Sequence, residues 1–264
     1  MNDTAAPRGL RFERAADSRP IAFIHPEHYR DWLTLQPAAT RCWLESQNFA
    51  GKSGQFALIP DDTGRWQRVL ALTGSDEPFA VAHLPKLLPK GDYHRCPDSS
   101  ATLHADHLLL GWGLGAYRFE RYLAGTESPR LHSEGHGEPA LAMLDASLRV
   151  RDWINLPTED MGPEQLQSAV FDAALAFNAK AEAIIGDDLL QQNFPTIHAV
   201  GRASHRAPRL LRLDWGDAAH PHVVLCGKGV CFDTGGLDIK TADGMRNMKK
   251  DMGGAAHALG LARL

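Results

Sequence analysis

Charged residues are concentrated in the stretch GKGVCFDTGGLDIK, residues 227–240, which contains two lysines, two aspartates, one cysteine and four glycines. A further aspartate, Asp251, follows eleven residues after Lys240. Aspartate carboxylates are hard oxygen ligands for zinc, manganese or magnesium, and one carboxylate can bridge two ions. One lysine could ligate a metal as its neutral amine, while another stays protonated and stabilises negative charge on a substrate oxygen. These residue types therefore indicate a metal site.

The spacing alone leaves other interpretations open. Two surface ion pairs on a glycine-rich turn would use the same residues, and lysine is a rare metal ligand. A phosphate-binding P-loop is a weaker alternative. The sequence Gly227-Lys228-Gly229 lacks the Ser or Thr that follows the lysine in that motif, and also the preceding glycine at Walker spacing.

The charged stretch is expected at the end of a buried strand. Residues 222–226, HVVLC, are apolar and lead directly into it, and a helix is expected from about residue 251. Active sites in open α/β sheets gather at strand ends, where loops converge on a ligand. The glycines on both sides of Lys228 would let the backbone there approach other groups closely.

The rest of the C-terminal half is expected to supply a helix and two more strands. Gly162 and Pro163 mark a helix start, and apolar residues at three- and four-residue steps extend this predicted helix to about residue 186. Strands are predicted at 196–200 and 209–215.

The N-terminal half contains a predicted hairpin, with strands at 55–59 and 67–72 around an Asp-Thr-Gly turn. A buried strand is predicted at 107–110 and a helix at 113–123. The Gly-, Ser-, Pro- and His-rich segment 124–139 reads as a loop or domain boundary.

Two histidines of that segment, His132 and His136, are spaced i, i+4 and could form a metal-binding pair. The glycines around them disfavour the helix that such a pair needs, so we expect a solvated loop. Together the elements predict an α/β protein, with an N-terminal α/β domain at residues 1–139 and a second, largely α/β domain at 140–264.

Composition excludes several classes of function. Lysine and arginine number 28 against 32 aspartates and glutamates, and the net charge of −4 provides no general field for nucleic acid or anionic membranes. No apolar run approaches the roughly 20 residues of a transmembrane helix, and the N-terminus has no apolar core of the signal-peptide kind. We expect a cytoplasmic protein. Its four scattered cysteines should be buried, reduced thiols: Cys42, Cys96, Cys226 and Cys231.

GKGVCFDTGGLDIK, followed by NMKKDMGGAA, resembles the signature of the leucine, or cytosol, aminopeptidase family of two-metal exopeptidases. The stretches RDWINLPTEDMGP, AVGRAS with PRLLRLDW, and GLGAYRFERY are similar to segments that the family carries in the same order. The resemblance covers roughly residues 107–264 and is most specific in the last 40. It implies an α/β catalytic domain behind a smaller α/β domain, a hexameric assembly, and removal of N-terminal residues, often leucine, from peptides.

Roles for individual residues follow from this resemblance. Lys228 would be an amine ligand to one of two divalent ions, zinc or manganese, and Asp251 a carboxylate ligand to the same ion. Asp233 would bridge both ions. Lys240 would be the catalytic cation that polarises the scissile carbonyl, with a metal-bridging hydroxide as the nucleophile.

One departure from the family pattern affects what we expect of this chain. The family supplies a further Asp, a bridging Glu and an Arg from an NTDAEGR-type segment beyond DMGGAA, and no stretch up to Leu264 resembles it. Thr241, where the family often has Pro, is a minor change. We therefore expect an N-terminal portion of an aminopeptidase that is inactive alone. The alternatives are a non-catalytic interaction module and, less favoured by the charge, a DNA-binding protein.

Overall fold

The computed structural model describes residues 6–125 and 127–264, and the chain divides into two compact units, residues 1–145 and 146–264. This division lies within helix α5, Glu138–Asn155. The domain boundary predicted between residues 139 and 140 lies near the start of the same helix and stays a prediction. Each unit combines helices and strands, so the predicted α/β class is confirmed.

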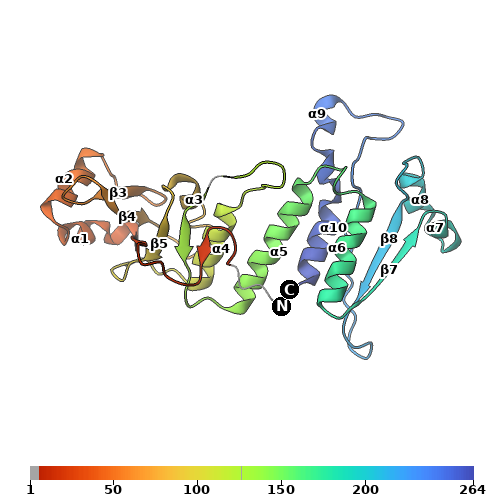
Figure 1. The fold of residues 1–264 in the computed structure, drawn as a ribbon, viewed down its shortest axis with the longest axis horizontal. Coiled ribbons are helices and arrows are strands. Elements are labelled where there is room, and N and C mark those ends of the chain that lie inside the picture. The colour runs from red at the N-terminus through yellow and green to blue at the C-terminus, as the bar shows by residue number, and fades with distance from the viewer. Residues whose placement is uncertain (1–5, 126) are drawn as a thin grey trace. The chain divides into compact units, whose positions relative to one another are not determined.

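The first unit is built on a six-stranded sheet in the order β1-β6-β5-β2-β4-β3 (Figure 1). Neighbouring strands are parallel except β3 and β4, which are antiparallel. Residues 21–24 of β2 are fully buried, as expected of a parallel strand that is covered on both faces. The strands are β1 Leu10–Arg11, β2 Arg19–Ile24, β3 Phe56–Pro60, β4 Trp66–Leu72, β5 Asp92–Arg95 and β6 Arg130–His132.

Short helices connect these strands, and their aromatic side chains complete a core. Tyr29, Trp32 and Leu44 pack against Ile24 and Leu70 of the sheet. This burial removes apolar surface from water and is the main favourable contribution to folding of the unit. The helices are η1 Pro26–His28, α1 Tyr29–Thr34, α2 Ala38–Ser46, α3 Leu84–Leu87 and α4 Ala105–Ala116.

The structure confirms one pair of predicted elements in this unit and corrects two. The predicted hairpin is β3 and β4, with Asp61 Oδ1 accepting the backbone N–H of Thr63 at 2.8 Å to close the turn. The strand predicted at 107–110 is wrong, because these residues lie in α4. The helix predicted at 113–123 ends at Ala116. A short apolar run fits a buried helix as well as a buried strand, and here the His104 side chain caps the helix by accepting the Asp106 N–H.

The predicted loop at 124–139 contains the short strand β6, which includes His132. His136 follows β6 outside any helix, and its Nδ1 lies 3.1 Å from Ser133 Oγ. The two histidines therefore lack the helical spacing that a metal-binding pair would need.

The second unit packs three helices and a two-stranded antiparallel sheet around one small core (Figure 1). Val170 and Ala173 of α6 contact Leu259 of α10, with Trp153 of α5 and Leu211 of β8 packed against them. The remaining elements are α6 Pro163–Ala176, β7 Lys180–Ile185, α7 Asp188–Gln191, α8 Pro195–Gly201, β8 Arg209–Asp214, α9 Ala242–Met245, η2 Met248–Met252 and α10 Gly253–Ala262.

Two helix and strand assignments in this unit need correction. The helix predicted to reach residue 186 ends at Ala176, and Asn178, with φ of +52°, turns the chain into β7. The strand predicted at 196–200 is helix α8, which begins at Pro195. Proline is favoured at a helix start, and this signal outweighed the β-branched residues that follow it. The strand predicted at 209–215 is confirmed as β8, and the helix expected from about 251 is confirmed by η2 and α10.

The strand predicted at 222–226 has no regular structure, and Val223 and Val224 are 85% and 79% exposed. In the described chain, β7 pairs with β8 and neither pairs with this segment. A strand needs the hydrogen bonds of a neighbour, so an apolar sequence alone does not make one.

Among the described residues, no helix combines the length and the apolar character that crossing a membrane requires.

Replacing Leu70 with Ala should lower the free energy of unfolding by about 2–5 kcal/mol, because it leaves a cavity in a core. Leu70 is 0% exposed, whereas Leu35 in the same unit is 82% exposed and serves as the control. Leu35→Ala should change the free energy by no more than about 0.5 kcal/mol. Urea denaturation followed by circular dichroism measures both, and equal effects would contradict this description of the core.

Candidate metal centre

Lys228 and Asp251 are brought together by a close approach of two chain segments. Lys228 Nζ lies 2.6 Å from Asp251 Oδ2, and the backbone N–H of Ala255 donates to the carbonyl of Lys228 at 2.9 Å. A Cβ atom on Gly227 would clash with the carbonyl of Gly254, so glycine is required where the loop crosses the start of α10. A backbone hydrogen bond therefore holds the two segments together in addition to the ion pair between Lys228 and Asp251.

Asp233 and Lys240 are joined by a tight turn. Lys240 Nζ lies 2.7 Å from Asp233 Oδ2, and the Lys240 N–H donates to the carbonyl of Thr234 at 2.9 Å. Asp233 Oδ1 also accepts the N–H of Gly235 at 2.9 Å. Gly235 has φ of +93°, a conformation that side-chain-bearing residues rarely adopt. The turn places the second lysine against the second carboxylate.

These two pairs form one cluster. The pKa of Asp233 is lowered to about 2, first because Lys240 donates to its carboxylate, then through the Gly235 N–H, with a smaller contribution from Asp251. The pKa of Lys228 is raised, first by the hydrogen bond to Asp251 and also by the negative charges of Asp251 and Asp233. The charge of Lys228 thus interacts with both carboxylates, and each carboxylate has one ammonium group in contact with it.

The chemistry of this donor set fits part of a metal centre. Two carboxylates and an amine are three donors for one divalent ion, and Lys240 would remain as a cation beside them. In residues 6–125 and 127–264, no three His, Cys, Asp or Glu side chains are grouped so that they could hold a metal ion. The three donors of this set are fewer than two four-coordinate ions would need. The same contacts also describe two ion pairs on a glycine-rich turn.

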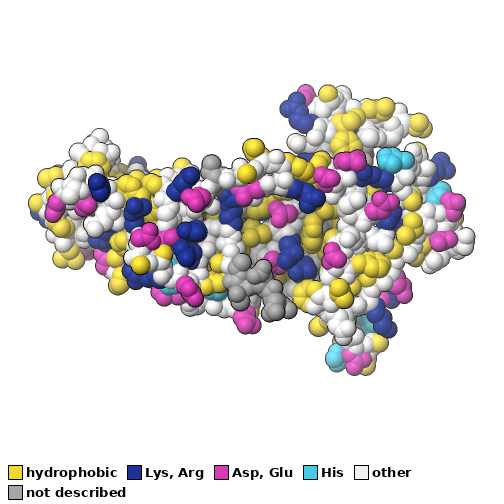
Figure 2. All heavy atoms as spheres, in the orientation of Figure 1, with side chains coloured by type: hydrophobic (Ala, Val, Ile, Leu, Met, Phe, Trp, Pro, Cys, Tyr) yellow, Lys and Arg dark blue, Asp and Glu magenta, His cyan; other side chains and the backbone are white. Residues whose placement is uncertain are grey.

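The cluster is open to solvent. The side chain of Asp251 is 17% exposed, whereas that of Lys228 is 56% exposed. Leu237 and Ile239, in the turn between Asp233 and Lys240, are exposed, and Figure 2 shows hydrophobic side chains gathered on the projecting segment around α9. Thr241 begins α9, where its hydroxyl accepts the N–H of Gly244 at 3.4 Å. A threonine is thus accommodated as a helix cap at this position.

Contacts around the cluster include residues that the sequence analysis did not single out. Thr158 Oγ1 donates to the carbonyl of Cys231 at 2.9 Å, and Lys240 Nζ lies 3.1 Å from Met248 Sδ. Thr158 lies in the segment RDWINLPTEDMGP, so its place in a stretch shared with the family was the one available signal.

The cysteines divide between buried and exposed positions. Cys231 is buried, and burial raises the pKa of its thiol to about 11, so the prediction of a buried thiol is confirmed there. Cys42 and Cys226 are exposed, which makes that prediction wrong for them, and Cys96 is half-buried. The apolar neighbours of Cys226 in the sequence suggested burial, but no strand forms around it.

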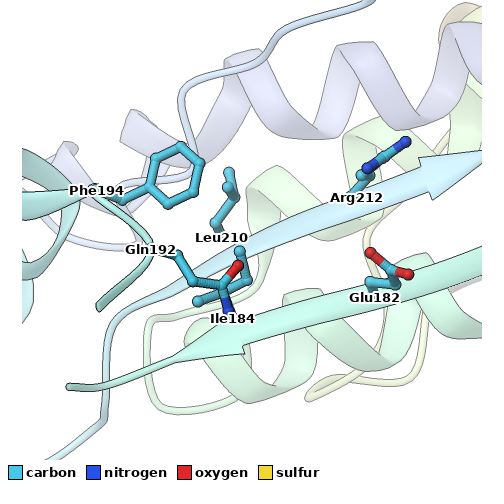
Figure 3. Close-up of a pocket in the computed structure, with 6 residues that line it drawn as sticks. All are labelled: Glu182, Ile184, Gln192, Phe194, Leu210 and Arg212. Carbon is cyan, nitrogen blue, oxygen red and sulfur yellow. The ribbon is translucent and has the colours of Figure 1, made fainter. Parts of the chain in front are cut away.

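A cavity of about 190 Å³ lies on one face of the two-stranded sheet (Figure 3). Its walls include the opposed pairs Glu182 with Arg212 and Ile184 with Leu210, closed at one end by Phe194. None of the four predicted site residues lines it.

Replacing Lys240 with Met should raise the pKa of Asp233 from about 2 toward the ordinary value near ~3.9. Since the folded chain lowers this pKa, the ion pair stabilises the fold above about pH 4, and the contribution is lost as the pH falls toward 2. NMR titration of the Asp233 carboxyl carbon measures the change. Lys180→Met, at an exposed position of β7, is the control, and an unchanged pKa in Lys240→Met would contradict the ion pair.

Two family models match the chain in succession. The M17 aminopeptidase, N-terminal domain, matches residues 19–131, and the Cytosol aminopeptidase family, catalytic domain, matches residues 149–264. Lys228, Asp233, Lys240 and Asp251 all lie within the second match.

Individual relatives agree with these matches. Peptidase B of Serratia proteamaculans is 43% identical over 235 residues, which are 84% of this chain and 52% of the relative. The crystal structure of cytosol aminopeptidase from Coxiella burnetii is 42% identical with a TM-score of 0.85, covering 95% of this chain and 56% of that one. The bottromycin maturation enzyme BotP in complex with Mn shares the fold, at 23% identity, a TM-score of 0.71, and 94% of this chain and 56% of that one.

The chain thus spans about half the length of the relatives it matches. Its first unit corresponds to the family's N-terminal domain, and its second unit carries the match to the catalytic domain. Because two successive domains of one family account for most of its residues, the chain belongs to the cytosol, or M17, aminopeptidase family.

Proposed function

We propose that the chain is part of a metal-dependent aminopeptidase that releases N-terminal residues, leucine-like ones among them, from peptides. The observation that carries this proposal is the cluster of Lys228, Asp233, Lys240 and Asp251 inside the segment that matches the family's catalytic domain. Each of the two carboxylates contacts one lysine ammonium group. A divalent ion could bind to such a group of side chains if one lysine released its proton and became a neutral amine.

Each residue of the cluster has a proposed role. Lys228, as its neutral amine, and Asp251, through its carboxylate, would hold one ion, and the Asp233 carboxylate would be shared with a second. When bound, the metal supplies Lewis acidity and a hydroxide nucleophile at neutral pH. Lys240, kept protonated, would bind the oxygen of the scissile carbonyl and stabilise the negative charge that develops there. Its present partner, Asp233, would then be neutralised by metal instead.

The identity of the metal and the assembly are part of the same proposal. We infer manganese or zinc as the ion, with two ions per active site, supported by the presence of Mn in the BotP structure and by the oxygen donors here. Peptides are the proposed substrates, a hexamer the proposed assembly, and the cytoplasm the proposed location. The net charge of −4 and the absence of a basic run disfavour nucleic acid as a partner.

A chimaera tests the proposed catalytic roles. This chain replaces the matched region of Serratia proteamaculans Peptidase B, and the parent protein is the positive control. With Mn²⁺ the chimaera should hydrolyse leucine amide. Lys240→Ala should lower kcat by about 10²–10³ without loss of bound Mn²⁺, whereas Asp251→Asn should lose metal and activity together.

Kinetics and metal analysis on the same samples separate the alternatives. Lys180→Ala, which removes an exposed lysine of the same unit, should match the unsubstituted chimaera. Equal loss of metal and activity in Lys240→Ala would make Lys240 a ligand or a structural ion pair. A folded chimaera that binds Mn²⁺ without hydrolysing leucine amide would favour the non-catalytic alternative, an interaction module.

The 264-residue chain alone should show no appreciable hydrolysis of leucine amide with added Zn²⁺ or Mn²⁺. Its cluster supplies two carboxylates and one amine, which leaves too little negative charge to hold two dications side by side. Electron paramagnetic resonance of Mn²⁺ should therefore detect at most one weakly bound ion per chain. Metal-dependent cleavage by this chain, abolished by Asp233→Ala, would contradict the prediction.

A further inference from the structure

The end of α5 and the residues that follow it contact both pieces of chain that carry the cluster. Thr158 Oγ1 donates to the carbonyl of Cys231 at 2.9 Å, two residues before Asp233. Lys249 Nζ, two residues before Asp251, donates to the carbonyl of Asn155. Residues 155–158 thus bridge the loop of Asp233 and the turn of Asp251.

Arg206 also contacts this bridging segment, through backbone carbonyls. Its Nη1 donates to the carbonyl of Thr158 at 2.7 Å, and its Nη2 to the carbonyl of Glu159 at 3.2 Å. Nη2 also lies 3.0 Å from Glu159 Oε2, and the Arg206 side chain is only 15% exposed. The planar guanidinium uses two nitrogens on adjacent peptide groups, which restricts the position of Thr158 more than a single contact would.

The loop of Asp233 depends on such contacts because it has no regular secondary structure from residue 222 to Gly235. The Ala255 N–H anchors it at Lys228, and Thr158 anchors it at Cys231, whose side chain is 8% exposed. Gly229 lies between these two anchors, and Asp233 follows the second anchor, Cys231, by two residues. Fixing the carbonyl of Cys231 therefore limits where the Asp233 carboxylate can lie.

We propose that Thr158 and Arg206 are positioning residues, which hold the Cys231–Asp233 backbone so that the Asp233 carboxylate keeps its place in the cluster. The inference rests on the proposed function for its consequence, namely metal affinity, but not for the backbone restraint itself. Thr158 acts through its hydroxyl, and Arg206 acts through the peptide carbonyls of Thr158 and Glu159. Neither side chain would touch a metal ion or a substrate.

Hydrogen–deuterium exchange and Mn²⁺ titration of the 264-residue chain test this inference. Thr158→Val keeps the shape of the side chain but removes the donor, and Thr158→Ser keeps the donor. In Thr158→Val the amides of Val230–Asp233 should exchange about fivefold faster or more, and the dissociation constant for Mn²⁺ should rise about tenfold. Thr158→Ser should retain the exchange rates and affinity of the unsubstituted chain.

Arg206→Gln provides an independent variant, with Arg212→Gln as a control of equal charge change at an exposed position of β8. Arg206→Gln should speed exchange at Val230–Asp233 and weaken Mn²⁺ binding, and Arg212→Gln should do neither. Equal exchange in Thr158→Val and Thr158→Ser would overturn the inference, as would faster exchange with unchanged Mn²⁺ affinity. If the unsubstituted chain binds no Mn²⁺, exchange alone decides the positioning role: faster exchange in Thr158→Val than in Thr158→Ser supports it, and equal exchange overturns it.

Discussion

The pairing of two carboxylates with two lysines is the interaction on which the candidate metal centre depends. Two carboxylates this close would repel each other, and each is neutralised by a lysine, Lys228 on Asp251 and Lys240 on Asp233. The neutralisation is visible in the lowered pKa of Asp233 and the raised pKa of Lys228. With one ammonium group on each carboxylate, the two positive and two negative charges of the cluster balance.

The backbone around the cluster serves to hold these charges in place. The close crossing of Gly227 and Gly254 sets the distance between the loop and the start of α10, and the Gly235 turn sets the distance from Asp233 to Lys240. The small core formed by α5, α6, α10, β7 and β8 carries the helix that supplies one side of this crossing. Because the loop lacks a strand of its own, individual hydrogen bonds such as that from Thr158 to Cys231 determine its course.

The first unit illustrates a different balance of forces. Its mostly parallel sheet is covered by helices, and fully buried residues such as Ile21 and Leu109 hold it together. Charges are paired here too, since Arg11 and Arg130 both contact Asp92. The match to the family's N-terminal domain covers most of this unit. The four candidate site residues lie in the second unit, within the match to the catalytic domain.

The sequence by itself identified the charged residues of the cluster and the family to which the chain belongs. The motif is local in the sequence: it consists of the types and spacing of Lys228, Asp233, Lys240 and Asp251, which do not depend on a correct secondary-structure prediction. Signals for turns and helix ends are local too, such as Pro163 at the start of α6. Their roles as metal ligands and catalytic cation stay predictions, since side-chain positions suit both a metal centre and ion pairs.

Only the tertiary structure decided which apolar runs became strands. Residues 107–110 and 196–200 are helical, and 222–226 are exposed, although all three have strand-like composition. A strand is stabilised by a neighbour that may be distant in sequence, so its formation depends on pairing that no local pattern records. The same holds for Thr158 and Arg206, because a side chain that positions a backbone carbonyl far along the chain has no distinctive spacing.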